Sequence, residues 1–246
     1  MKTIPRLCAV IPMKDSGQAK QRLAGVLSGT QRRELALAMF EDVLATLAAV
    51  PELAGILVVT VDPSAGAIAA RYGARVASDG AHAGHTGAVA AAARQLAAEG
   101  LGMLEVPGDI PLVEAGDIRQ LIAAHGSVPD RTLGSTLGST LGGSRAFTIA
   151  PARDQRGSNA VLCSPADAVP LRFGENSFFP HLAAARACGI EPKVLQLPHI
   201  ALDIDTPDEL ALFLAAPSRT RARALLEQWR VDCDTTTSKD GIRVTA

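Results

Sequence analysis

The run Leu7-Cys-Ala-Val-Ile11 and the run Ile56-Leu-Val-Val-Thr60 are short, apolar and rich in residues that favour strands. Between them, Ser28-Gly-Thr-Gln31 has the pattern of a capping box, which starts a helix. From Gln31 to about Ala49 the apolar residues recur every fourth position, as on one face of a helix. The chain therefore opens with strand, helix and strand, the unit from which parallel sheets are built.

The same rhythm continues along most of the chain. Further strands are expected at residues 75–78, 103–106, 147–150, 160–164, 194–197 and 201–204. Further helices are expected at residues 64–72, 86–99, 114–125 and 177–188, from residue 206, and at 218–230. Alternation of this kind predicts an α/β fold in three layers, with a mostly parallel sheet covered by helices on both faces.

The 246 residues fit one domain over residues 1–216, followed by an Arg-rich helix and a polar, frayed tail over 217–246. Residues 126–145 contain the repeat Thr-Leu-Gly-Ser and have little apolar surface to bury. We interpret this segment as a flexible low-complexity loop, and a functional lid is the alternative.

Composition excludes several classes of protein. The chain has 24 Lys and Arg against 25 Asp and Glu, a net charge of −1, so a basic nucleic-acid clamp is not expected. No apolar run approaches the roughly 18 residues of a membrane helix. The four cysteines have no paired spacing. We therefore expect a cytoplasmic protein, monomeric or homodimeric, that binds neither nucleic acid nor membrane.

The segment after the first strand is basic. Lys14, Lys20 and Arg22 lie close together around Gly17, although the chain contains only five lysines. Such a loop can wrap a polyphosphate, but the P-loop spacing is absent. A solvated basic loop is the alternative.

Acidic residues follow two later strands. Asp109 lies between Gly108 and Pro111, where it can hold Mg²⁺ against phosphate oxygens or merely cap a turn. Asp203 and Asp205 point to the same side if the strand at 201–204 continues. We expect Asp203 to complete the metal site and Asp205 to secure the start of the next helix.

A last cluster joins Gly157-Ser158-Asn159 to Arg172-Phe-Gly174-Glu-Asn-Ser177. Its glycine-flanked amides, its hydroxyl groups and the helix start at Ser177 suit a small phosphorylated acid. Two ordinary turns are the alternative.

Taken in order, these pieces resemble the 2-phospho-L-lactate guanylyltransferase family over residues 4–215. The resemblance implies a Rossmann-like nucleotidyltransferase domain that acts on GTP and 2-phospho-L-lactate, phosphoenolpyruvate or 3-phospho-D-glycerate, as in the synthesis of coenzyme F-420. The Gly-Asp-x-Pro and Asp-x-Asp-Thr-Pro pieces also occur in molybdenum-cofactor nucleotidyltransferases. The lysine loop and Arg172-Phe-Gly174 are more particular to the family.

The resemblance also implies roles for individual residues. It assigns the GTP phosphates to Lys14, Lys20 and Arg22, and Mg²⁺ to Asp109 and Asp203. It assigns the phospho-acid to Ser158, Asn159, Arg172, Gly174 and Ser177. It assigns the rest of the nucleotide to Pro12, Lys14, Gly84, Thr86 and Gly108. The chain departs from the family pattern at Gln21, where serine is usual, and at Gly84-His85-Thr86-Gly87, where Gly-x-Asn-Ala is frequent.

In the implied reaction the phosphate of the acid attacks the α-phosphorus of GTP and pyrophosphate leaves. The nucleophile is already anionic, so cations rather than a general base are required. One rival is a molybdenum-cofactor-type nucleotidyltransferase, whose glycine-rich loop after the first strand is absent here. Another is a catalytically silent nucleotide-binding protein.

Overall fold

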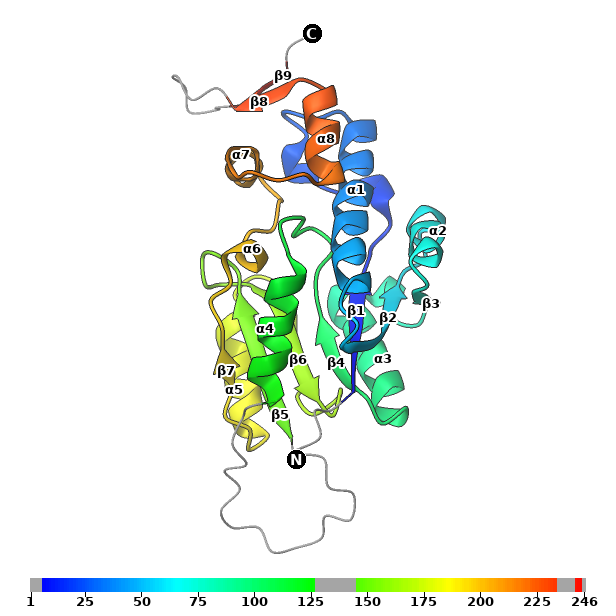
Figure 1. Ribbon diagram of the computed structural model, residues 1–246, viewed down its shortest axis with the longest axis vertical. Coiled ribbons are helices and arrows are strands. Elements are labelled where there is room, and N and C mark those ends of the chain that lie inside the picture. Colours follow the sequence, from blue (N-terminus) through cyan, green and yellow to red (C-terminus); the bar gives the residue numbers. More distant parts are fainter. Residues whose placement is uncertain (1–5, 127–144, 234–241, 245–246) are drawn as a thin grey trace, which may run out of the picture.

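The computed structural model describes residues 6–126, 145–233 and 242–244. Its centre is a sheet with strand order β3-β2-β1-β4-β6-β5-β7 (Figure 1). The strands are β1 (Leu7–Pro12), β2 (Leu53–Val59), β3 (Arg75–Ala77), β4 (Gly102–Glu105), β5 (Ala146–Pro151), β6 (Ser158–Ser164) and β7 (Lys193–Val194). All pairings are parallel except the two that β6 makes with β4 and β5. The predicted mostly parallel α/β sheet is thus confirmed.

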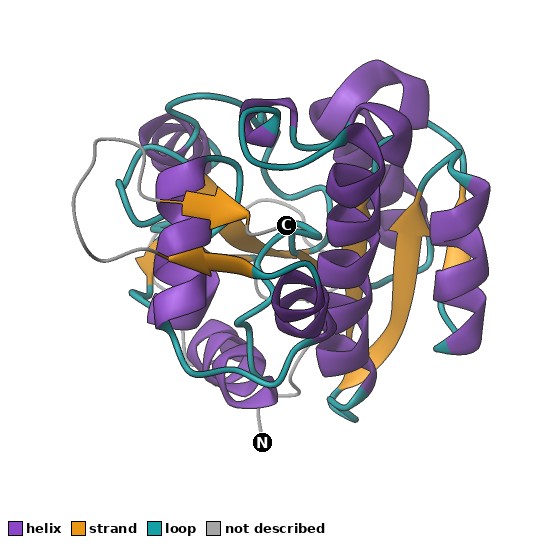
Figure 2. Cartoon of the chain, turned by 90° about the horizontal axis from the view of Figure 1, so that it is seen from above, coloured by secondary structure: helices purple, strands orange, loops and turns teal. Residues whose placement is uncertain are grey.

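Helices cover both faces of this sheet (Figure 2). These helices are α1 (Gly29–Ala48), α2 (Pro63–Arg71), α3 (Gly84–Ala98), α4 (Ala115–Gly126), α5 (Phe178–Ala187) and α6 (Pro198–Ala201), and α7 (Pro207–Ala215) and α8 (Arg221–Gln228) follow them in the chain. Side chains of α1, α2, α4 and α6 share one buried cluster, whereas α3 and α5 belong to clusters on the opposite face. The predicted three-layer arrangement therefore holds.

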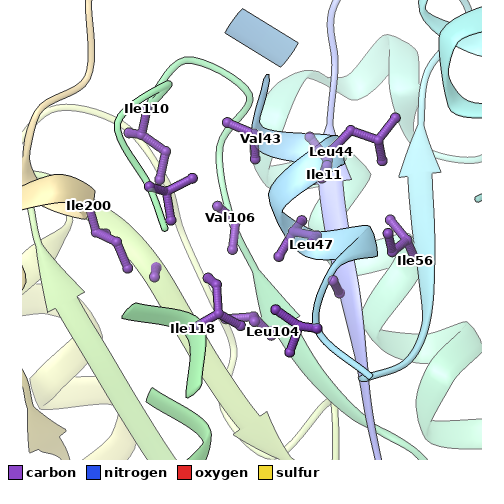
Figure 3. Close-up of a cluster of buried hydrophobic side chains, with 14 of the residues drawn as sticks. Ile11, Val43, Leu44, Leu47, Ile56, Leu104, Val106, Ile110, Ile118 and Ile200 are labelled. Atoms are coloured by element: carbon purple, nitrogen blue, oxygen red, sulfur yellow. The ribbon is translucent and has the colours of Figure 1, made fainter. Parts of the chain in front are cut away.

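The alternation of β1 explains how one strand serves both faces. Leu7, Ala9 and Ile11 pack in the cluster under α1, and Cys8 and Val10 pack in the cluster under α3. Figure 3 shows the first cluster, in which side chains of α1 lie beside those of β1 and β4. Burial on both faces keeps the carboxyl ends of these strands rigid, and the candidate site lies there.

Two helix starts follow the predicted local chemistry. The hydroxyl of Ser28 accepts from the backbone of Gln31, whose side chain accepts from the backbone of Ser28. The same reciprocal bonds join Thr206 and Glu209 at the start of α7, with Pro207 at its first position. Both capping boxes are confirmed.

The predicted strand at 194–197 is confirmed only in part, and the predicted strand at 201–204 is wrong. The first is only Lys193–Val194, and the second is replaced by the short helix α6 and a loop. Pro198 starts α6, and Ile200 is buried in the core without joining a ladder. An apolar run therefore marked burial here but not a strand.

The C-terminal part is more structured than expected. Figure 1 shows α7 and α8 beyond the end of the sheet, with α8 next to α1. Ala222 and Leu226 of α8 share a buried cluster with Leu35 and Met39 of α1. The tail expected to be frayed includes an antiparallel pair, β8 (Val231–Cys233) with β9 (Ile242–Val244). These contacts tie α8 to the main body of the protein.

Most of the repeat-bearing segment at 126–145 lies outside the described residues. No helix within residues 6–126, 145–233 and 242–244 has the length and apolar character needed to cross a bilayer. Cys8, Cys163 and Cys188 carry free thiols.

Candidate active site

Lys20 is the centre of a cluster of charged side chains at the carboxyl end of the sheet. Its Nζ donates to Oδ2 of Asp109 and to Oδ1 of Asp205, each at 2.7 Å, and its side chain is only 7 % exposed. Burial opposes the charge, but the carboxylates of Asp109 and Asp205 raise the pKa of Lys20 above its usual value. Its backbone is left-handed at φ 53°. This strained, charged conformation is held by the surrounding loops and is typical of a functional position.

Asp203 is the third carboxylate of the cluster. Its Oδ1 accepts a hydrogen bond from Nδ2 of Asn159 at 3.0 Å. Burial and the negative charge of Asp109 raise the pKa of Asp203 to about 6. A buried carboxylate whose ionisation is opposed by a neighbouring negative charge favours the arrival of a cation.

The donor set suits Mg²⁺ supplied with a phosphate-bearing substrate. Among the described residues, no group of three or more His, Cys, Asp or Glu side chains is arranged to hold a metal by itself. Magnesium is commonly bound by one or two carboxylates together with substrate phosphates and water. Asp109 and Asp203 fit this pattern.

The expectation for Asp205 is wrong. Its carboxylate pairs with Lys20, and the start of α7 is capped by Thr206 and Glu209 instead. Burial would raise the pKa of Asp205, but the charge of Lys20 outweighs this and lowers it. Residues 202–206 form a loop, so strand alternation does not set the directions of Asp203 and Asp205.

A neutral half of the site is formed by Ser158, Ser177 and His181. Nδ1 of His181 lies 3.0 Å from Oγ of Ser158, and Oγ of Ser177 donates to Ser158 Oγ at 3.2 Å. The backbone N–H of Arg172 donates to Nε2 of His181 at 3.0 Å. The structure thus brings together Ser158, Ser177 and the Arg172 backbone, as predicted.

Asn159, Gly174 and Arg172 differ in their structural environment within this region. Both amide hydrogens of Asn159 are used inside the protein, by the carbonyl of Ile200 and by Asp203. Of the predicted pair Ser158 and Asn159, Ser158 is therefore the residue whose side chain still has a hydrogen to donate. Gly174 has φ +142°, a conformation that side chains rarely adopt. The side chain of Arg172 is exposed.

A small cavity lies beside the lysine loop. Its lining residues are Pro12, Met13, Lys14, Val59, Ala81, Gly84, His85 and Ala88. Gly84, at φ +72°, opens α3 at its edge. Three of the predicted nucleotide-binding residues, Pro12, Lys14 and Gly84, therefore lie together. A Cβ on Gly108 would lie 3.4 Å from Phe40, so the loop after β4 packs closely on α1.

Thr86 connects this cavity to the neutral half. Its Oγ1 accepts from the backbone N–H of Phe173 at 3.0 Å and lies 3.3 Å from the Phe173 carbonyl, to which it donates. Both backbone groups of Phe173 are therefore held by one hydroxyl. The predicted nucleotide residue Thr86 thus supports the loop that contains Arg172 and Gly174.

The remaining cations of the lysine loop are more exposed. Lys14 is exposed at the cavity, and the Arg22 side chain is 66 % exposed, with Nη2 at 3.6 Å from Oε1 of Glu175. The loop is anchored by Ser16, whose backbone and hydroxyl both donate to Asp62. The loop is therefore fixed at Ser16 and Lys20, with Lys14 and Arg22 open to a ligand.

Sequence reasoning missed two histidines and a glutamate. His85 lies 2.8 Å from the fully buried Glu105 and stacks on Phe173 with ring centres 4.3 Å apart. Burial raises the pKa of Glu105 above its usual value. A glutamate within the apolar run 103–106 was a signal that could have marked it. His181 had no such signal, because its partners come from distant segments.

Solved structures share this architecture. A candidate nucleotide-diphospho-sugar transferase from Desulfovibrio desulfuricans G20 superposes with a TM-score of 0.67, at 18 % identity, over 90 % of this chain and 94 % of that one. A 4-diphosphocytidyl-2C-methyl-D-erythritol synthase from Anaerococcus prevotii DSM 20548 gives a TM-score of 0.53, at 12 % identity, over 91 % and 96 %. At such identities the likeness defines the fold class, which is the three-layer α/β fold of these transferases.

The family follows from the sequence comparison. Residues 7–246 match the family described as "Guanylyl transferase CofC like", and the chain belongs to this family. It is 34 % identical to a phosphoenolpyruvate guanylyltransferase of Roseiflexus castenholzii, over 91 % of this chain and 95 % of the relative. It is 35 % identical to a 3-phospho-D-glycerate guanylyltransferase of Colwellia psychrerythraea, over 82 % and 89 %. It is 29 % identical to a 2-phospho-L-lactate guanylyltransferase of Methanothermobacter thermautotrophicus, over 97 % and 98 %. The family resemblance seen in the motifs is confirmed.

Proposed function

We propose that this protein is a guanylyltransferase that transfers GMP from GTP to a small phosphorylated three-carbon acid and releases pyrophosphate. Relatives named for phosphoenolpyruvate, 3-phospho-D-glycerate and 2-phospho-L-lactate support this substrate class. The observation that carries the proposal is the cluster of Lys20 with Asp109, Asp203 and Asp205 at the carboxyl end of the sheet. Open α/β sheets bind ligands at this edge.

Each half of the site has a separate substrate in this proposal. Asp109 and Asp203 hold Mg²⁺, which lowers the repulsion between the phosphate groups when it is bound. Lys14, Lys20 and Arg22 bind the phosphates of GTP, and the rest of the nucleotide lies along Pro12, Gly84, Thr86 and Gly108. The phospho-acid lies against the hydroxyls of Ser158 and Ser177, the turn at Gly174 and the exposed Arg172.

The chemistry needs positioning more than proton transfer. A phosphate oxygen of the acid forms a bond to the α-phosphorus of GTP, and the bond from that phosphorus to the bridging oxygen of the β-phosphate breaks. The departing pyrophosphate keeps the electron pair. Because the attacking oxygen is already anionic, the residues must bring two polyanions together and neutralise the charge that builds on the leaving group. Lys20 supplies a fixed positive charge beside Asp109.

The test is pyrophosphate release by the purified protein with GTP, Mg²⁺ and each of the three acids. We expect release with at least one acid, together with a GDP-linked acid detected by mass spectrometry. GTP without acid, and ATP or CTP with acid, are the controls. Binding of GTP without release for any acid would favour a silent nucleotide-binding protein. Transfer to a molybdopterin would favour the molybdenum-cofactor class.

A further inference from the structure

His181 is buried in α5, with 1 % of its surface exposed, and both of its ring nitrogens have partners. The partner of Nε2 is a backbone N–H, that of Arg172, which can only donate. Nε2 must therefore accept, and the proton of the neutral ring must lie on Nδ1. Consequently Nδ1–H donates to Oγ of Ser158.

The direction of this bond decides what the two serines can do. Ser158 and Ser177 have two hydroxyl hydrogens between them, and one is used in the bond that joins their oxygens. The lone pair of Ser158 that faces His181 is occupied, so its hydroxyl hydrogen cannot turn toward the ring. Whichever serine donates to the other, one O–H is left over, and it has no acceptor among the described residues.

The environment keeps His181 in this state. Burial, together with the charge that His85 can carry beyond Phe173, lowers the pKa of His181 to about 4. The ring is therefore neutral at physiological pH, and a neutral ring with a fixed acceptor has only one tautomer. The edge of Phe173 against the ring, with centroids 5.0 Å apart, restricts its rotation.

We propose that His181 is a positioning residue that turns the Ser158–Ser177 pair into an obligate hydrogen-bond donor for an anionic oxygen of the phospho-acid. This inference rests on the proposed function, because it assigns the acid to this half of the site. A hydroxyl that must donate outward favours phosphate or carboxylate oxygens over groups that themselves donate. His181 does not touch the substrate, and it also links the donor pair to the loop at Arg172.

The first test is the KM for the acid that supports turnover, measured separately from the KM for GTP. In His181→Phe the ring volume remains but both hydrogen bonds are lost. We expect the KM for the acid to rise by about 10-fold or more, with the KM for GTP changed by less than about 2-fold, because a charge-assisted hydrogen bond is weakened on one substrate only. His181→Asn retains a donor near the Nδ1 position, and it should recover part of the loss.

His125 provides a matched control. It is also buried, bonds to Thr148 and Ser164, and has a pKa lowered to about 4 by burial. It lies at the opposite end of the sheet, beside the C-terminal end of β6. His125→Phe should therefore reduce thermal stability as His181→Phe does, but it should leave both KM values unchanged.

A second variant tests whether His181 acts through the serines. Ser158→Ala alone leaves a hydroxyl on Ser177, so both serines are replaced. In Ser158→Ala/Ser177→Ala, the further change His181→Phe should not raise the KM for the acid. A further rise of 10-fold there, or equal rises for acid and GTP in His181→Phe, overturns the inference.

Calorimetric binding of each of the three acids separates this inference from the proposed function. If the wild type binds an acid but releases no pyrophosphate, the proposed function fails. The inference then still stands, provided that His181→Phe weakens that binding by about 10-fold or more. If the wild type releases pyrophosphate and His181→Phe binds the acid as the wild type does, the inference alone fails. If no acid binds and no pyrophosphate is released, both are overturned.

Discussion

The two halves of the candidate active site are held together by different forces. In the charged half, Lys20 bridges Asp109 and Asp205, and the negative charge of Asp109 acts on the buried Asp203. In the neutral half, directional hydrogen bonds join His181 to Ser158 and Ser158 to Ser177. The charged half is thus held together by ion pairs, whereas the neutral half is held together by hydrogen bonds between uncharged groups. This difference explains why substitutions in the two halves should have different signatures.

The largest expected effect concerns the carboxylates of the charged half. Asp109→Asn keeps the shape of the side chain but removes a charge that faces both Lys20 and the proposed Mg²⁺. We expect kcat for pyrophosphate release to fall by about 10³-fold while the fold survives. Asp203→Asn should behave similarly, and Asp205→Asn should cause a smaller loss because Asp205 pairs only with Lys20.

Steady-state rates at several Mg²⁺ concentrations provide the measurement, with circular dichroism as the control for folding. Equal turnover of the wild type and Asp109→Asn at saturating Mg²⁺ would remove Asp109 from the site.

The second expectation concerns Lys20. Lys20→Met removes the charge that holds Asp109 and Asp205 together and leaves two carboxylates to repel each other. We expect kcat to fall by about 10²-fold. We expect the free energy of unfolding to fall by about 1–3 kcal/mol, which is less than for a fully buried ion pair because both carboxylates are partly exposed. Lys20→Arg retains the charge but not the compact geometry between two oxygens at 2.7 Å, and it should also be slow.

Urea denaturation and turnover of the same preparations check both numbers. If the Lys20→Met protein were as stable and as active as the wild type, the Lys20 bridge would contribute to neither stability nor catalysis.

The same contrast explains which residues of the site could be predicted from the sequence. The charged half was predictable, because Lys20 and Asp109 each follow a strand that the apolar pattern identifies, and parallel strands bring such ends together. Asp205 was misassigned because a strand was expected at 201–204, where α6 ends at Ala201 and a loop follows. His181 could not be predicted, because the partners of its side chain, Ser158 and Arg172, meet it only when β6 and α5 pack together.

The third expectation is that the two halves contribute opposite pH dependences to stability. The folded pKa of His181 is about 4, below the ordinary value of 6.5, so its contribution to stability is present above pH 6.5 and is lost as the pH falls toward 4. The folded pKa of Asp203 is about 6, above the ordinary 3.8, so its protonation stabilises the fold at low pH and that contribution is lost as the pH rises to 6. Between these limits each group contributes a slope of up to about 1.4 kcal/mol per pH unit, with opposite sign.

Urea denaturation without Mg²⁺ between pH 4.5 and 7.5 measures these slopes as differences between variants. Asp203→Asn should make the loss of stability on acidification steeper than in the wild type, and His181→Phe should make it shallower. If both variants changed the slope in the same direction, the two environments would not differ as described.

The smallest expected effect lies where the two halves meet at the surface. Arg22 and Glu175 approach to 3.6 Å, but their side chains are 66 % and 81 % exposed. Exposed pairs of this kind contribute about 0–1 kcal/mol, so Glu175→Gln should shift the free energy of unfolding by less than about 0.5 kcal/mol. Arg22→Gln should be equally mild in stability. If Arg22 binds a phosphate of GTP, however, Arg22→Gln should raise the KM for GTP several-fold, and Glu175→Gln, which frees the guanidinium, should not. A KM for GTP unchanged in both variants would limit the phosphate contacts of the loop to its lysines.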